Sequence, residues 1–196
     1  LAADRKFLSS LGIDAPTAEG YLFPETYHFT RSMSPEDIFR SMVRQWQGRF
    51  TSDLRQRAAA LGLSVHELMT FASLIGKEAK LAEEKPMVSA VFHNRLKKKM
   101  RLQSDPTAVY ALEKTEKKVT SRDLRKETAH NTYRIYGLPP GPIANPGIDS
   151  IQAALNPAPV DYLYFVAKND GSHHFSSTLA SHRQAVIKYQ INKKKI

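Results

Sequence analysis

The sequence predicts an α+β fold: a single compact domain that is rich in helices and carries small β-sheets. Apolar residues recur at helical spacing through most of the first half of the chain. Short apolar or alternating runs, bounded by Pro and Gly, stand at 19–29 and 162–175 and are typical of strands. The chain has 196 residues, 41% of them hydrophobic, which is enough for one sizeable core. No internal repeat or linker divides the chain, so we expect one domain over residues 1–196.

The first half contains the strongest helix signals. Ser34 and Ser64 are predicted N-caps, and Ser64 with Glu67 forms a capping box. The alternating aromatic residues of 19–29 predict a strand that is broken at Pro24. The expected helices cover part of 1–18 before Gly12, then 34–46, 52–61, 63–80 and 83–96.

The second half is more broken. A polar loop at 101–107 leads into a short helix from Pro106, with Asp105 as its expected cap, and helical pattern continues to residue 112. Ser121 is expected to cap another short turn. Seven Pro or Gly residues at 137–147 predict a stiff loop. The remaining expected elements are a helix at 148–155, a buried strand at 162–166, a turn at 170–171, a returning strand from residue 174 and a last helix at 178–189.

Composition limits the possible partners and chemistry. Cysteine is absent, which excludes disulfides, a thiol nucleophile and a cysteine metal site. No apolar run approaches the roughly 20 residues that cross a bilayer. The net charge of +10 suits an anionic partner such as nucleic acid, anionic lipid or a cell-wall polymer. Basic residues are not interleaved with aromatics as in single-strand binders, so we expect no nucleic acid. The lysine runs at 97–99, 117–118 and 193–195 are typical of solvated helix ends and a tail.

One acid stands at the edge of the apolar stripe of the expected helix 63–80. Glu78 follows Ile75 by three residues and Phe71 by seven, so it projects toward packed structure or a cleft. A poorly solvated carboxylate keeps its proton to higher pH, which is what a general acid needs. The alternative explanation is an ion pair with Lys77, Lys80 or another basic partner.

The remaining sequence offers few other chemistries. It has no Walker loop, dinucleotide fingerprint or GxSxG turn. Its seven histidines lack HExxH spacing, so we expect no metal centre and no cofactor. Acid chemistry in a groove with aromatic and amide groups suits glycosidic bonds. Most glycosidases need two carboxylates, but one suffices when the sugar's own 6-hydroxyl is the nucleophile, as in a lytic transglycosylase.

Eight segments together resemble one family. They are EGYLFPETY at 19–27, ASLIGKEA at 72–79, VFHNRL at 91–96, RLQSDPT at 101–107, NTY at 131–133, GLPPGPIANPG at 137–147, YLYFVA at 162–167 and HHFSSTLASH at 173–182. In this order and spacing they are similar to the YceG-like (MltG) endolytic murein transglycosylases, and the resemblance covers nearly the whole chain.

The resemblance implies an enzyme that cuts nascent peptidoglycan strands internally at the β-1,4 bond between MurNAc and GlcNAc, leaving 1,6-anhydroMurNAc ends. It implies Glu78 as the catalytic acid, the second acid of an ExE pattern whose first position is here Gly76. It also implies residues that bind glycan or support Glu78: Glu19, Gln103, Ser104, Asp105, Asn131, Thr132 and Tyr133.

Family members usually carry an N-terminal membrane helix and a LysM-like module, neither of which is in this sequence. The resemblance therefore implies a soluble catalytic fragment of a protein that is anchored in the inner membrane and faces the periplasm. The implied partners are peptidoglycan strands and cell-wall synthases, the penicillin-binding proteins.

Two alternatives to the lyase remain open. The first is a hydrolytic muramidase, in which Asp105 or Glu25 holds the attacking water. The second is a binding module without catalysis, which recognises either the cell wall or nucleic acid.

Overall fold

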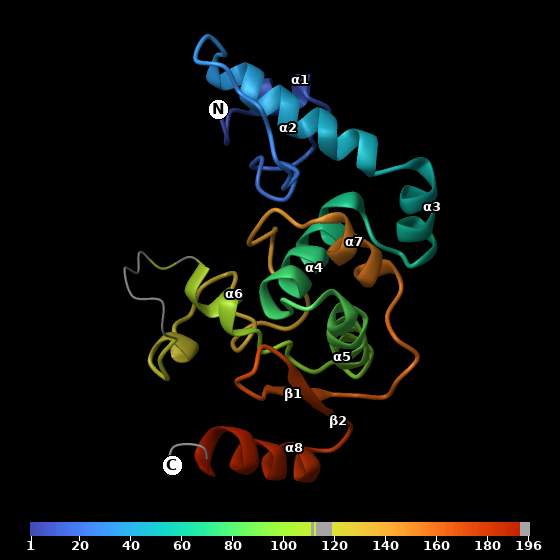
Figure 1. Ribbon diagram of the computed structural model, residues 1–196, viewed down its shortest axis with the longest axis vertical. Helices are drawn as coiled ribbons and strands as arrows, with labels where there is room; N and C mark the ends of the chain where they lie inside the picture. Colours follow the sequence, from blue (N-terminus) through green and yellow to red (C-terminus); the bar gives the residue numbers. More distant parts are fainter. Residues whose placement is uncertain (111, 113–118, 193–196) are drawn as a thin grey trace.

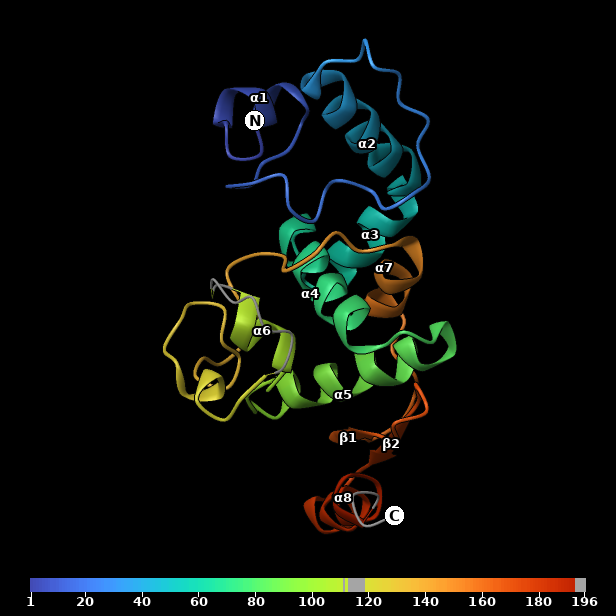
Figure 2. The ribbon, with the colours of Figure 1, turned by 60° about the vertical axis from the view of Figure 1, so that its left-hand side comes forward.

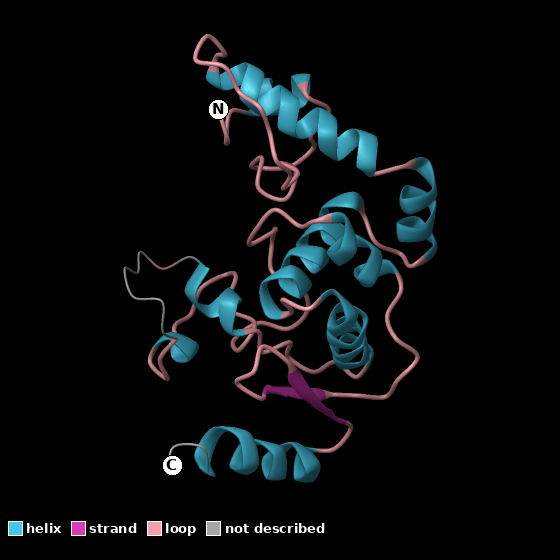
Figure 3. Cartoon of the chain, viewed as in Figure 1, coloured by secondary structure: helices cyan, strands magenta, loops and turns pink. Residues whose placement is uncertain are grey.

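The computed structural model describes residues 1–110, 112 and 119–192. It confirms a helix-rich α+β fold with one small sheet (Figure 3). The helices are α1 (Arg5–Ser10), α2 (Pro35–Arg49), α3 (Ser52–Ala60), α4 (Val65–Glu78), α5 (Lys85–Lys97), α6 (Asp105–Tyr110), α7 (Ile148–Leu155) and α8 (Leu179–Val186). Short turns are η1 (Ala82–Glu84), η2 (Asp123–Arg125) and η3 (Ile187–Ile191), and the strands are β1 (Tyr164–Ala167) and β2 (His173–Ser176).

The molecule is elongated, and its elements are distributed along its long axis (Figures 1 and 2). Helices α1 and α2 lie at one end, and the β1–β2 hairpin with α8 lies at the other. Helices α4, α5 and α7 occupy the middle, with α6 to one side. The middle of the molecule is therefore built around α4, which contacts α3, α5, α6 and α7.

Local signals fix the start of α4. The Ser64 side chain accepts a hydrogen bond from the Glu67 backbone N–H, and the Glu67 carboxylate accepts one from the Ser64 N–H at 2.9 Å. This reciprocal bonding satisfies two amides that the first turn cannot pair, and it confirms the predicted capping box. The same arrangement between Ser34 and Asp37 starts α2.

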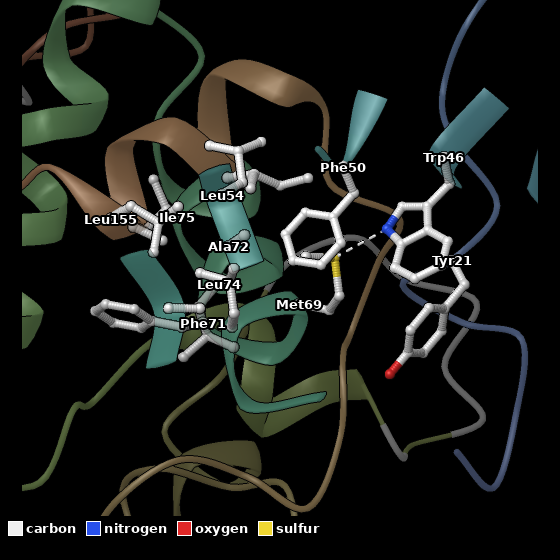
Figure 4. Close-up of a cluster of buried hydrophobic side chains, with 14 of the residues drawn as sticks. Tyr21, Trp46, Phe50, Leu54, Met69, Phe71, Ala72, Leu74, Ile75 and Leu155 are labelled. Atoms are coloured by element: carbon white, nitrogen blue, oxygen red, sulfur yellow. Dashed lines mark hydrogen bonds between the residues drawn. The ribbon is translucent and has the colours of Figure 1, made fainter. Parts of the chain in front are cut away.

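The core surrounds α4, whose central turns are mostly apolar and buried on every side. Every residue from Leu68 to Ile75 is buried. At one end of α4, the indole N–H of Trp46 donates to the sulfur of Met69 at 3.4 Å, and the Tyr21 ring packs edge-on against Trp46 (Figure 4). A helix buried on all faces is held rigidly by its neighbours, which also fixes the position of its last residue.

The predicted strand at 19–29 is wrong. This segment buries Tyr21 and Phe23, as the alternation suggested, but it pairs with no strand in the described part of the chain. The backbone N–H groups of Gly20 and Leu22 instead donate to the side-chain oxygen of Asn145, at 2.7 and 3.2 Å. A single side chain from the loop at 137–147 thus replaces the neighbouring strand.

The predicted hairpin is confirmed, with two adjustments. Strands β1 and β2 pair antiparallel with Phe165 opposite Phe175. The first strand was expected to be buried, but its residues are only half-buried or exposed. The last helix is regular only to Val186 and then widens into the π-helical turn η3.

Two predicted caps are wrong. The turn η2 is closed by Thr120 instead of Ser121, since the Thr120 hydroxyl accepts from the Asp123 N–H at 3.3 Å. Asp105 is the first residue of α6 itself, and its carboxylate accepts from the Tyr133 hydroxyl. The expected helical residue 111 and the lysine runs at 117–118 and 193–195 lie outside the described residues.

In the described part of the chain, no single helix has both the length and the hydropathy of a membrane span. Only α3 and α4 taken together reach them, and that pair is bent by 92°.

Gly20 provides a test of how the segment at 19–29 is held. Its φ is +92°, and a Cβ there would lie 2.5 Å from Cγ of Pro142. Gly20→Ala should therefore cost both the left-handed backbone energy of about 1–2 kcal/mol and a steric clash. Gly62→Ala is the matched control, because Gly62 has φ +69° with no atom within 4 Å of the added Cβ. Denaturant unfolding should show a clearly larger loss for Gly20→Ala, and equal losses would contradict this packing.

Candidate active site

Glu78 is the last residue of α4, and the chain turns away directly after it. Ala79 is already extended, with φ −105° and ψ 118°. The Glu78 side chain opens onto a cavity of about 420 Å³. The cavity is lined by Glu78, Arg95, Leu102, Gln103, Asp105, Tyr133, Phe165, Val166, Ala167, His173, His182, Val186 and Gln190. The predicted acid therefore faces a cleft, and the structure shows no ion pair between it and a lysine in the described residues.

The surroundings of Glu78 raise its pKa from 4.5 to about 7. Burial is the main cause, because the packed end of α4 disfavours the charged form. The Ser104 hydroxyl opposes this by donating to Oε1 of Glu78 at 2.6 Å. The negative charge of Asp105 raises the pKa further, while the Asp105 backbone N–H and Arg95 lower it. A carboxyl group with this balance is half-protonated near neutrality and is able both to give and to take a proton.

A buried hydroxyl network holds Ser104 in place. The Ser104 backbone N–H donates to Oγ1 of Thr132 at 2.9 Å, and Thr107 donates its hydroxyl proton to the Ser104 carbonyl at 2.6 Å. The Thr132 backbone N–H in turn donates to the Thr107 hydroxyl at 3.1 Å. Ser104, Thr107 and Thr132 are all fully buried. The network joins the 101–107 loop to residue 132 behind the cavity wall.

Gln103 and Asp105 present polar groups to the cavity from either side of Ser104. Gln103 adopts φ +52°, a left-handed conformation uncommon for residues other than glycine, and its side-chain oxygen accepts from Arg95 Nη1 at 3.3 Å. The Asp105 carboxylate accepts from the Tyr133 hydroxyl at 2.5 Å. Burial and this bond raise the pKa of Tyr133, so its hydroxyl stays protonated and keeps the Asp105 carboxylate in place.

Asn131 and Thr132 lie behind the cavity. Neither side chain is exposed, and the Asn131 amide donates to the carbonyls of Leu124 and Lys126 at 3.2 and 2.6 Å. The structure thus places these two predicted residues where they support Ser104 and Tyr133 rather than where they meet a ligand.

Glu19 lies apart from Glu78. Its carboxylate accepts from the Tyr110 hydroxyl at 2.7 Å, and it lines a separate cavity of about 270 Å³ together with Tyr110 and Asn145. Burial, together with this hydrogen bond and the charge of Glu19, raises the pKa of Tyr110 to about 12. Contact between Glu19 and a substrate stays a prediction, and the structure does not bring Glu19 together with the other site residues.

The sequence reasoning missed the basic residues of the cavity. Arg95 is 7% exposed, and His173 and His182 join it from β2 and α8. A signal for Arg95 was present, since it follows Val88 and Phe92 on the apolar stripe of α5, where a charged residue is out of place. The histidines carried no such signal, because their position depends on how the hairpin folds back onto the body.

Comparison with known proteins identifies the family. A family model described as YceG-like matches residues 2–188. The chain belongs to the YceG-like family. It is 45% identical over 172 residues to the endolytic murein transglycosylase of Bacillus subtilis, covering 87% of this chain and 48% of that protein. It is 32% identical over 177 residues to the enzyme of the same name from Streptococcus pneumoniae strain D39, covering 87% of this chain and 32% of that protein.

A solved structure supports the same assignment. A YceG-like protein from Listeria monocytogenes aligns with a TM-score of 0.84 at 39% identity, over 94% of this chain and 65% of that one. The chain spans about half or less of the curated relatives that it matches.

Gly76 stands where the family resemblance implies the first acid of an ExE pattern, and the structure shows what a side chain at this position would reach. Gly76 faces α7, where an added Cβ would lie 3.1 Å from Oγ of Ser150. Ser150 accepts from the buried Lys85 ammonium at 3.1 Å, and Lys85 also pairs with Asp149. Glu78 projects instead toward Ser104. An acid at position 76 would thus adjoin Lys85 and Ser150, so its absence leaves the contacts of Glu78 unchanged.

Replacement of Ser104 tests the hydrogen bond that offsets part of the effect of burial on the pKa of Glu78. In Ser104→Ala, Glu78 loses a donor that favours its charged form, so its pKa should rise above about 7. The expected rise is up to about one unit, since such a bond contributes about 1.5 kcal/mol. Carbon-13 NMR titration of the Glu78 carboxyl measures it. Ser89→Ala removes a buried hydroxyl without a partner among the described residues and should leave that pKa unchanged. An unchanged Glu78 pKa in Ser104→Ala would refute the conclusion that the Ser104 hydroxyl lowers this pKa.

Glu78 also makes stability depend on pH. Between pH 4.5 and about 7 the unfolded chain has released the Glu78 proton while the folded chain still holds it. The free energy of unfolding should fall as pH rises through this window. Glu78→Gln cannot ionise, so it should match the wild type near about pH 4 and exceed it by about 1–3 kcal/mol near about pH 8. Urea unfolding of both proteins at the two pH values measures the difference, and a gap that is independent of pH would contradict the raised pKa.

Proposed function

We propose that this chain is the catalytic part of an endolytic lytic transglycosylase, which cuts peptidoglycan strands between MurNAc and GlcNAc and leaves 1,6-anhydroMurNAc ends. The observation that carries the proposal is the Glu78 carboxyl group, with its pKa near 7, at the wall of a polar cavity. The names of the relatives support the same reaction.

The first step is proton transfer. Protonated Glu78 donates to the oxygen that bridges the two sugars, and the bond from that oxygen to the anomeric carbon of MurNAc breaks. The GlcNAc portion leaves as an alcohol, and positive charge develops on the MurNAc ring. The Asp105 carboxylate faces the same cavity and is held in place by Tyr133, so it can stabilise that charge electrostatically.

The second step returns the proton. Glu78 is now a carboxylate and removes the proton from the 6-hydroxyl of the same MurNAc. The 6-oxygen bonds to the anomeric carbon and closes the 1,6-anhydro ring. Glu78 ends protonated, as it began, and no water is consumed. Because the nucleophile belongs to the substrate, proximity replaces the second carboxylate that a hydrolase would need.

The hydrolytic alternative has weaker support. Glu25 is outside the cavity residues and forms a loose ion pair with Arg49 at 3.6 Å. Asp105 is in the cavity, but its carboxylate is tied to the Tyr133 hydroxyl at 2.5 Å. The relatives carry the name of a transglycosylase, which favours ring closure over attack by water.

The cellular setting belongs to the same proposal. The family resemblance supports a membrane-anchored protein, with this domain in the periplasm near the cell-wall synthases that supply new strands. The net charge of +10 would draw the domain to the anionic wall or to lipid-linked substrate.

The proposed mechanism predicts the behaviour of Glu78→Gln. Gln is nearly isosteric but has no proton to donate at this position, so cleavage of purified glycan strands should fall by about 10²–10⁴-fold with glycan binding retained. Glu25→Gln is the matched control and should keep full activity. Mass spectrometry of the wild-type products should show ends lighter by one water than hydrolysis gives. Undiminished cleavage by Glu78→Gln would refute the mechanism, and ends at the hydrolytic mass would establish the muramidase.

A further inference from the structure

One wall of the cavity neither gives nor takes a proton in the proposed reaction. It is formed by Arg95 of α5 and by the C-terminal lobe, which comprises β1, β2, α8 and η3. The lobe is fixed to the body through the Glu84 carboxylate, which accepts from the backbone N–H and Nδ1 of His173 at 2.8 and 2.7 Å. These two hydrogen bonds hold the lobe, and the polar groups that it contributes to the cavity, against the body.

The Arg95 guanidinium is anchored by part of its donors and leaves others open. Nε donates to the Leu163 carbonyl at 2.7 Å, and Nη1 donates to the Leu102 carbonyl at 2.8 Å. Nη2 forms no hydrogen bond within the described part of the chain, and it is accessible to solvent. Nη2 thus opens to the cavity, and its direction is already fixed by the anchored nitrogens.

His182 offers a second open donor. Its Nδ1 is buried without a partner, whereas Nε2 is accessible to solvent and forms no hydrogen bond among the described residues. Burial, Arg95 and His174 lower the pKa of His182, so the ring is neutral near pH 7. A proton on the buried Nδ1 would have no acceptor, which costs free energy. The neutral ring therefore carries its proton on Nε2, toward the cavity.

Tyr164 brings the two donors together. The Arg95 guanidinium carbon lies 5.3 Å from the centre of the Tyr164 ring. The His182 ring stacks on the same tyrosine, with centroids 5.1 Å apart and planes 20° apart. Side chains from α5 and α8 thus both pack against Tyr164 of β1, and both Arg95 and His182 line the cavity.

We propose that Arg95 and His182 bind the acyl oxygen of the lactyl group on MurNAc, and so distinguish muramyl glycans from glycans of GlcNAc alone. This inference rests on the proposed function. The anhydro end always forms on the muramyl sugar, so the site must recognise that sugar. The acetamido group occurs on both sugars and cannot distinguish them. The lactyl acyl oxygen, as carboxylate or amide, is a strong acceptor that only MurNAc carries, and it suits a guanidinium donor.

The test compares two ligands in the Glu78→Gln background, which prevents turnover. Isothermal titration calorimetry would measure binding of a peptide-free murein hexasaccharide and of chitohexaose, which lacks lactyl groups. His182→Phe keeps a ring stacked on Tyr164 and removes the donor. It should weaken murein binding by about fivefold to tenfold and leave chitohexaose binding unchanged. Arg95→Lys keeps the charge but not the anchored geometry, and should show the same selective loss.

Gln184→Ala alters an exposed position of α8 outside the cavity and should change neither affinity. Circular dichroism and thermal unfolding would check that each variant is folded. Equal weakening for both ligands would assign the wall to acetamido groups, and unchanged murein binding in His182→Phe would remove His182 from the site. Either result overturns the inference. Failure of the wild type to cleave strands would instead refute the proposed function. Cleavage is measured separately, since the binding comparison uses a background that cannot turn over.

Discussion

The hydrogen bond from Ser104 to Glu78 is the constraint on which the site depends. It joins the end of α4 to the loop before α6, at 2.6 Å. Burial alone would keep Glu78 protonated and make it a poor base, while full solvation would leave it a poor acid. The hydroxyl of Ser104 and the N–H of Asp105 offset part of the burial cost, and the pKa settles near 7. The buried bonds of Thr107 and Thr132 keep Ser104 at the required position.

The cavity has two chemically different walls that come from distant parts of the chain. Glu78 and Asp105 supply carboxyl groups on one side, and Arg95 with His182 supplies donors on the other. Arg95 connects the walls, since its guanidinium bonds both the Leu102 carbonyl and the Leu163 carbonyl. A buried cation needs such partners to offset its desolvation. The same bonds that keep Arg95 stable therefore also tie the segment at Leu102 to the segment at Leu163.

Local signals made much of this architecture predictable. Apolar stripes and the caps at Ser34 and Ser64 gave the main helices, and Glu78 stood out because an acid at the edge of a stripe is unusual. The strand expected at 19–29 failed because alternation reports burial and not a hydrogen-bonding partner. There the partner is Asn145, which lies 125 residues from Gly20 in the sequence. The cavity position of His182 was missed for the same reason, since nothing near residue 182 in the sequence reveals which surface α8 faces.

The location of the acid reflects a conflict between stability and function. A carboxyl group with a raised pKa destabilises the folded chain whenever it ionises, so it must sit where other interactions are strong. Helix α4 provides such a place, because its central residues from Leu68 to Ile75 are all buried and its start is closed by a capping box. Only at its last residue does α4 reach the cavity. The fold thus keeps the packed turns and the ionising group on one rigid element, and the packing limits the motion of Glu78 relative to a bound glycan.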